Sequence, residues 1–182
     1  FLDRISKIRE ETMPGINISR AEALERSSHL TVASYDVTID VTNGEETFIA
    51  KTIVKFACNK SGYDTFVDAV GKRIISATLN GESVDVTNLD GESVFLKNLA
   101  ASNKLVLEIE AIYSKSGEGL QRSVDPVDNE VYLYSQGEIA FIRHMFPCFD
   151  QPDLKGTFTL TAIAPSHWEV ISNNPEKSKS DL

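Results

Sequence analysis

The sequence predicts a mainly β domain, an antiparallel sandwich or saddle-like fold with a short helix near its amino-terminal end. Two observations predict this class. Apolar and polar residues alternate with a period of two along many short segments, and turn-forming dipeptides separate these segments without helical periods between them. A chain of 182 residues with 41% hydrophobic and 25% charged residues can build one domain with a substantial core.

Short strands with turn signals between them account for most of the chain. Val37 and Ile39 alternate with polar neighbours, which predicts a half-buried strand. Asn80-Gly81 and Asp90-Gly91 are typical of hairpin turns. Residues 114–129 contain glycine, proline and several charges without alternation, and we expect a long loop there. The expected strands cover residues 29–41, 47–57, 65–70, 73–79, 83–86, 93–96, 104–113, 131–134, 157–164 and 168–172.

The ends of the chain differ in composition from its middle. The first residues mix charge with a Pro-Gly pair and show no clear period. Ser19 and Glu22 have the spacing of a capping box, which predicts a short helix through about Ser27. The expected division is an extended or poorly ordered arm over residues 1–18, the β-sandwich domain over residues 19–175, and the start of a linker toward a further domain over residues 176–182.

Charge and hydropathy exclude several classes of partner. Acidic residues outnumber basic ones by 27 to 18, and the net charge of −9 repels phosphate backbones, so nucleic acid is not an expected partner. No stretch approaches the ~20 apolar residues of a membrane span. Nothing in the chain resembles a signal peptide, and we expect a cytoplasmic location.

The side chains that most often carry metal or thiol chemistry are sparse. His29, His144 and His167 lie far apart, and no pair has the i, i+4 spacing that directs two imidazoles toward one metal, so no metal site is expected in this chain. Cys58 and Cys148 do not make a disulfide framework, and we expect buried free thiols. Cys148 lacks the orienting network that a nucleophile needs, which argues against a cysteine hydrolase.

Gln136 and Glu138 are the candidate binding residues. Two residues at i and i+2 of an extended segment project to the same side. A carboxylate beside an amide suits a primary ammonium, which offers three hydrogen-bond donors and a positive charge. The alternative is that Glu138 is a solvated surface acid and that Gln136 is a hydrogen-bonding loop residue. Spacing alone favours this alternative.

The segment that follows, residues 146–153, combines a thiol with two carboxylates but is predicted to be structural. Pro147 and Pro152 restrict the backbone, and Phe146 and Phe149 are expected to anchor the segment in the core. Asp150 is expected to accept hydrogen bonds from nearby backbone amides in a turn.

Read in order, Gln136-x-Glu138, Arg143 and the Phe-Pro-Cys-Phe-Asp-x-Pro run at 146–152 resemble the aminopeptidase N family of zinc metallopeptidases. The resemblance is strong from 113 to 158, extends more weakly over residues 19–175, and is nearest to the bacterial alanyl or lysyl type. It implies the amino-terminal domain of an enzyme that releases N-terminal residues from peptides. Zn²⁺ would then be bound outside this chain by a His-Glu-x-x-His helix and a distant Glu, and the chain alone would be inactive.

The resemblance also implies roles and partners. Glu138 is expected to anchor the substrate's α-ammonium and Gln136 to form part of the S1 pocket, with neither residue a zinc ligand. The expected partners are peptides with a free amino terminus and the missing catalytic domain of the same chain. Two alternatives stay open: a stand-alone β-sandwich module for binding or scaffolding, and the same domain in an epoxide hydrolase relative.

Overall fold

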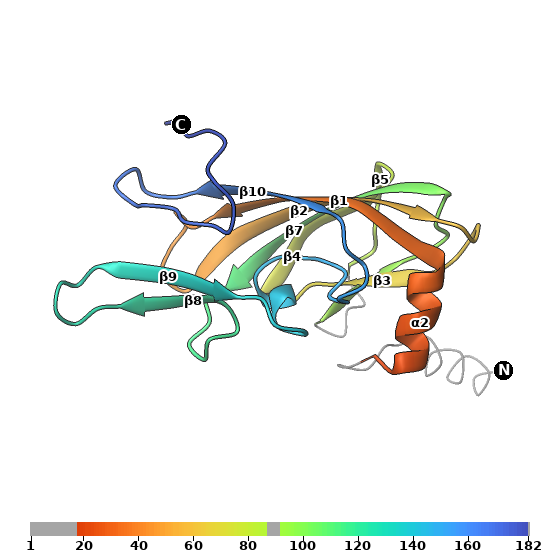
Figure 1. Cartoon of the computed structure of the whole chain (residues 1–182), viewed down its shortest axis with the longest axis horizontal. Coiled ribbons are helices and arrows are strands. Elements are labelled where there is room, and N and C mark those ends of the chain that lie inside the picture. Colours follow the sequence, from red (N-terminus) through yellow and green to blue (C-terminus); the bar gives the residue numbers. More distant parts are fainter. Residues whose placement is uncertain (1–17, 87–91, 182) are drawn as a thin grey trace.

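A six-stranded sheet forms the main layer of the fold (Figure 1). The computed structural model describes residues 18–86 and 92–181. The strand order is β10-β1-β2-β7-β4-β5, and β10 runs parallel to β1 whereas the other neighbours are antiparallel. The strands of this sheet are β1 (Leu30–Asp40), β2 (Thr47–Cys58), β4 (Arg73–Leu79), β5 (Glu82–Ser83), β7 (Ser102–Ile112) and β10 (Thr157–Ile163).

Two smaller antiparallel sheets lie on one side of the large sheet (Figure 1). One pairs β3 with β6 and the other pairs β8 with β9. Their bounds are β3 (Thr65–Asp68), β6 (Ser93–Leu96), β8 (Gly119–Val124) and β9 (Val131–Gln136); the helical elements are α2 (Arg20–His29) and the 3₁₀ turn η1 (Ile142–His144). The mainly β class with a short amino-terminal helix is thus confirmed.

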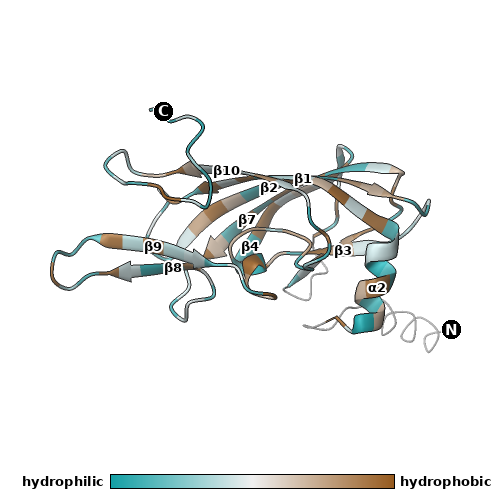
Figure 2. Cartoon of the chain, viewed as in Figure 1, coloured by the Kyte–Doolittle hydropathy of each residue, from teal (hydrophilic) through white to brown (hydrophobic). Residues whose placement is uncertain are grey.

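The hydrophobic core lies between these layers. Bands of apolar and polar residues alternate along β1 and β2 (Figure 2), and the apolar side faces inward. Val37 of β1 and Leu107 of β7 are fully buried, and they belong to one cluster with Val67 and Val94 of the small β3–β6 sheet. Burying one such side chain contributes about 1.5–3 kcal/mol, so this shared core fixes β3 against the large sheet.

The predicted helix is present and is closed at its start by the expected capping box. Ser19 N donates to the Glu22 carboxylate at 2.7 Å, and Glu22 N donates to Ser19 Oγ at 3.3 Å. The helix runs to His29, slightly beyond the predicted end at Ser27. Its buried residue Arg26 turns toward β3, where it becomes part of the site described below.

Several predictions about strands were wrong. Residues 114–129 were expected to form a loop but contain β8, a polar strand that is held by its pairing with β9. Residues 168–172 form no strand, because Ile171 is 92% exposed and the chain turns where Trp168 N donates to Pro165 O at 2.9 Å. The expected strand at 83–86 is reduced to a short pairing at 82–83.

The remaining predictions concern turns, the arm and the thiols. Asn80 and Gly81 both have positive φ, 56° and 90°, as the hairpin between β4 and β5 requires. The second predicted turn, at 90–91, and the arm over residues 1–18, apart from Ile18, lie outside the described residues. Cys58 and Cys148 are buried free thiols, as expected, and burial raises the pKa of Cys148 well above its ordinary value.

Candidate functional site

The two predicted binding residues lie together at the end of β9. Gln136 is the last residue of that strand, and its Nε2 donates to Glu138 Oε1 at 2.9 Å. Both side chains are exposed. The pair thus presents a carboxylate and an amide side by side at the surface, a combination that suits a primary ammonium.

A close approach between two segments fixes the path of the chain before this pair. In the β8–β9 pairing, Gln136 lies opposite Gly119. Gly119 has φ of 66°, and a Cβ added there would lie 2.8 Å from Cβ of His144. Only glycine permits both the backbone conformation and the contact, so the β8–β9 hairpin can pack directly against η1.

The chain after Glu138 turns sharply into η1. Phe141 N donates to Glu138 O at 3.0 Å, and this bond closes a turn over residues 138–141. Ala140 within it has φ of 70°, a left-handed conformation that is unfavourable by roughly 1–2 kcal/mol for a residue with a Cβ. Strained backbone of this kind tends to persist at functional sites, where the surrounding structure holds it.

A cavity of about 440 Å³ opens beside the turn. Glu138 and Ile139 line it together with aromatic side chains that include Phe146 and Phe158. Ile139 is 68% exposed and Phe158 is 51% exposed, so both contribute apolar surface to the cavity that Glu138 lines. The cavity thus places the Glu138 carboxylate beside a largely apolar lining that also includes Asp150, Gln151 and Lys155. A mainly apolar pocket with a few polar groups is typical of sites for small ligands or for docked side chains.

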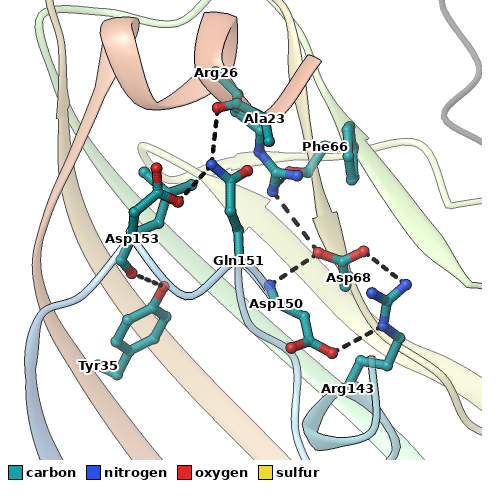
Figure 3. Close-up of polar contacts among 10 residues, drawn as sticks. Ala23, Arg26, Tyr35, Phe66, Asp68, Arg143, Asp150, Gln151 and Asp153 are labelled. Carbon is teal, nitrogen blue, oxygen red and sulfur yellow. Dashed lines mark hydrogen bonds and ion pairs between the residues drawn. The ribbon is translucent and has the colours of Figure 1, made fainter. Parts of the chain in front are cut away.

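Figure 3 shows a buried network of charges, and one member of it, Asp150, also lines the cavity. Arg143 of η1 contacts two carboxylates: its Nη1 lies 3.1 Å from Asp68 Oδ1, and its Nε lies 3.0 Å from Asp150 Oδ2. Asp68 Oδ2 also accepts from Asp150 N at 3.0 Å and lies 3.8 Å from Arg26 Nη2. The network therefore joins η1, β3, α2 and the segment after η1.

Desolvation dominates the electrostatics of this network. Burial raises the pKa of Asp68 above its ordinary value, although Arg26 and Arg143 both oppose the shift. The guanidinium of Arg26 lies 3.9 Å from the centre of the Phe66 ring and donates to Phe66 O at 2.9 Å. These contacts compensate part of the hydration that a buried cation loses.

Asp150 differs from the prediction. It was expected to accept from backbone amides in a local turn, but its carboxylate accepts from the Arg143 side chain. The partners Asp68 and Arg143 are brought to it by the tertiary fold, which a local reading of the sequence could not foresee. Phe146 and Phe149 are buried as predicted, and the Phe149 ring makes an edge contact with Phe56 at 5.2 Å.

Sequence reasoning missed three residues of the site. Asp68 and Arg26 were not singled out, although an acid in the apolar run of β3 and a base on the inner side of α2 are signals of buried pairing. The left-handed conformation of Ala140 leaves no signal in the sequence, because alanine ordinarily avoids it.

The residues that the structure describes do not fit a zinc site. Within residues 18–86 and 92–181, no group of three or more His, Cys, Asp or Glu side chains is placed to hold a metal ion. His29 Nδ1 is instead 2.9 Å from Asn59 Oδ1, and His167 packs edge-on against Trp168. Among the helices of the described chain, none has the length and apolar character needed to cross a membrane.

The fold is shared with zinc metallopeptidases. The M1 zinc metallopeptidase from Deinococcus radiodurans aligns with a TM-score of 0.55 and 22% identity, over 74% of this chain and 32% of that one. At this identity the likeness concerns the fold alone. The model of the Peptidase M1 N-terminal domain matches residues 31–182, and the chain belongs to this family.

Relatives with curated names agree with this membership. Aminopeptidase N of Streptomyces lividans is 40% identical over 173 residues, which cover 93% of this chain and 20% of that protein. Leucyl aminopeptidase of Saccharolobus solfataricus is 31% identical over 114 residues, 60% of this chain and 14% of that protein. The resemblance to the aminopeptidase N family is therefore confirmed, and the chain spans about a fifth of the length of its Streptomyces relative.

Proposed function

We propose that this chain is the substrate-amine-binding domain of a zinc aminopeptidase that releases N-terminal residues from peptides. The observation that carries the proposal is the 2.9 Å hydrogen bond between Gln136 and Glu138, on an exposed segment between a paired strand and an anchored turn. Family membership and the 40% identity to an aminopeptidase N support the class of enzyme.

The roles of the two side chains follow from their donors and acceptors. The α-ammonium of a peptide donates to the Glu138 carboxylate, a charge-assisted bond that contributes about 1.5–3 kcal/mol. Gln136 Nε2 is used in holding Glu138, and its carbonyl oxygen can contact the first residue of the substrate as part of the S1 pocket. A peptide without a free amine offers the carboxylate no charged partner, which restricts cleavage to the amino terminus.

The catalytic domain of the same protein is the proposed partner of this chain and the proposed site of zinc. A bound Zn²⁺ supplies polarisation of the scissile carbonyl and activation of water. The part assigned to this domain is to bind and orient the amino terminus, which sets the specificity of the reaction. The domain has no bond-breaking group of its own in this scheme.

The experiment that tests the proposal compares two substrates in the full-length protein. We expect leucine p-nitroanilide to be hydrolysed and its N-acetyl form to be cleaved at least ~100-fold more slowly, because the acetylated amine cannot pair with Glu138. A chelator should abolish the activity and added Zn²⁺ should restore it.

Two outcomes contradict the proposal. If the free and the acetylated substrate are cleaved at equal rates, the enzyme does not depend on binding the free amine, which contradicts the role of Glu138. Absence of hydrolysis of any aminoacyl substrate in a zinc-loaded full-length protein favours a binding or scaffold module instead.

A further inference from the structure

We propose that Arg143 is a positioning residue for the Glu138 carboxylate, and that Asp68 and Asp150 hold Arg143 for this task. The inference rests on the proposed function of Glu138 and adds the residue that fixes where its carboxylate lies. Three observations carry it: the anchoring of Arg143, the short path from Arg143 to Glu138, and the shape of the guanidinium.

Arg143 is anchored to the body of the domain through both its main chain and its side chain. Val70 N donates to Arg143 O at 3.0 Å, just beyond the end of β3. The Arg143 side chain forms its ion pairs with Asp68 and Asp150 at 3.1 and 3.0 Å, and the residue is only 8% exposed. Arg143 is thus a fixed point in a surface segment.

The path from Arg143 to Glu138 consists of local turns. Phe141 N donates to Glu138 O at 3.0 Å, and His144 N donates to Phe141 O at 3.1 Å. Ala140 holds its strained conformation within the first of these turns. Such bonds fix the shape of the turn but not its place on the domain. The position of Glu138 therefore depends on two anchors, the β8–β9 pairing before it and Arg143 after it.

The shape of the guanidinium explains why the anchor is an arginine. Its Nη1 and Nε bond to different carboxylates, Asp68 on β3 and Asp150 after η1. A planar group with several fixed donors holds both at once, whereas a lysine ammonium is a single point on a flexible stem. Arg143→Lys therefore keeps the charge and loses the fixed orientation.

The test uses the full-length enzyme and the substrate leucine p-nitroanilide. We expect Arg143→Lys to raise KM about 10-fold and to change kcat by less than about threefold, since a displaced carboxylate weakens binding in the ground state and the transition state alike. Ile109→Val, in the core strand β7, is the matched control. It is expected to lower stability by about 0.5–1.5 kcal/mol without changing KM.

A double mutant separates positioning from a merely structural effect. If Arg143 acts through Glu138, Arg143→Lys should cause no further rise in KM in a Glu138→Ala enzyme. Should Arg143→Lys fail to fold, Asp150→Asn gives a second test, because it removes the charge of one of the two carboxylates that hold Arg143 and leaves Asp68 in place. Asp150→Asn is likewise expected to raise KM.

The outcomes distinguish this inference from the proposed function. If Glu138→Ala alone leaves kcat/KM unchanged, Glu138 does not bind the substrate amine, and both the proposed function and this inference are wrong. If Glu138→Ala strongly lowers kcat/KM but Arg143→Lys or Asp150→Asn leaves KM unchanged, Glu138 binds the amine and Arg143 does not position it. An additive rise of KM in the double mutant also overturns it.

Discussion

Replacement of Glu138 by alanine in the full-length enzyme is expected to lower kcat/KM for free-amine substrates by roughly 100-fold. The substitution removes the proposed acceptor of the α-ammonium and also the partner that orients Gln136. A charge-assisted hydrogen bond of about 1.5–3 kcal/mol corresponds to a factor of about 10 to 150, and the substrate amine would be left without this partner. Steady-state kinetics on leucine p-nitroanilide measures the effect.

Two further variants show which property of Glu138 matters. Glu138→Gln keeps the size and a hydrogen-bond acceptor but loses the charge, and a smaller loss of about 10-fold is expected. Glu130→Ala removes another exposed acid near the other end of the β8–β9 hairpin and should leave kcat/KM unchanged. Equal losses in Glu130→Ala and Glu138→Ala would show that general negative charge, and not an anchor, attracts the substrate.

The second large effect is expected on folding. Asp68→Ala leaves the buried Arg26 and Arg143 without their shared carboxylate, and Asp150 N loses its acceptor. Removing one partner from a buried ion pair typically lowers the free energy of unfolding by about 3–5 kcal/mol, because the remaining charge stays desolvated. Urea denaturation of the 182-residue chain measures the change.

The control for this prediction is an ion pair at the surface. Glu108 lies 3.6 Å from Lys51 in a pair whose side chains are 28% and 45% exposed. Glu108→Ala should lower the free energy of unfolding by no more than about 1 kcal/mol, since exposed pairs are screened by water and salt. If Asp68→Ala were as mild as Glu108→Ala, the buried network could not be the anchor that holds η1.

Much of the fold could be predicted because its signals are local. The alternation along β1 and β7 predicted which residues are buried, and the Ser19–Glu22 box predicted the start of α2. The strand β8 could not be predicted, because its polar residues show no alternation and the strand exists through its pairing with β9. The parallel pairing of β10 with β1 is likewise a property of the tertiary fold.

The candidate site was predictable to a similar extent. Spacing alone favoured a surface acid and a loop residue, and it was the family resemblance of the whole motif that singled out Gln136 and Glu138. The structure joins the two side chains by a hydrogen bond. The network behind them was not predicted, because Asp68 and Arg143 are distant in sequence and only folding brings them within 3.1 Å. The local sequence thus indicated the residue that is proposed to bind the substrate. The charged network near it consists of contacts between residues far apart in the sequence, which local patterns do not predict.

The central claim is that the Glu138 carboxylate binds the free amine of the substrate. The most direct measurement is a cycle with two inhibitors, leucine hydroxamate and its counterpart without the amine, on the wild-type full-length enzyme and on Glu138→Ala. Loss of the amine should weaken inhibition of the wild type by roughly 100-fold and inhibition of Glu138→Ala by less than about threefold, since the two groups are partners. An equal loss in both enzymes would contradict the claim, because the amine would then be bound elsewhere.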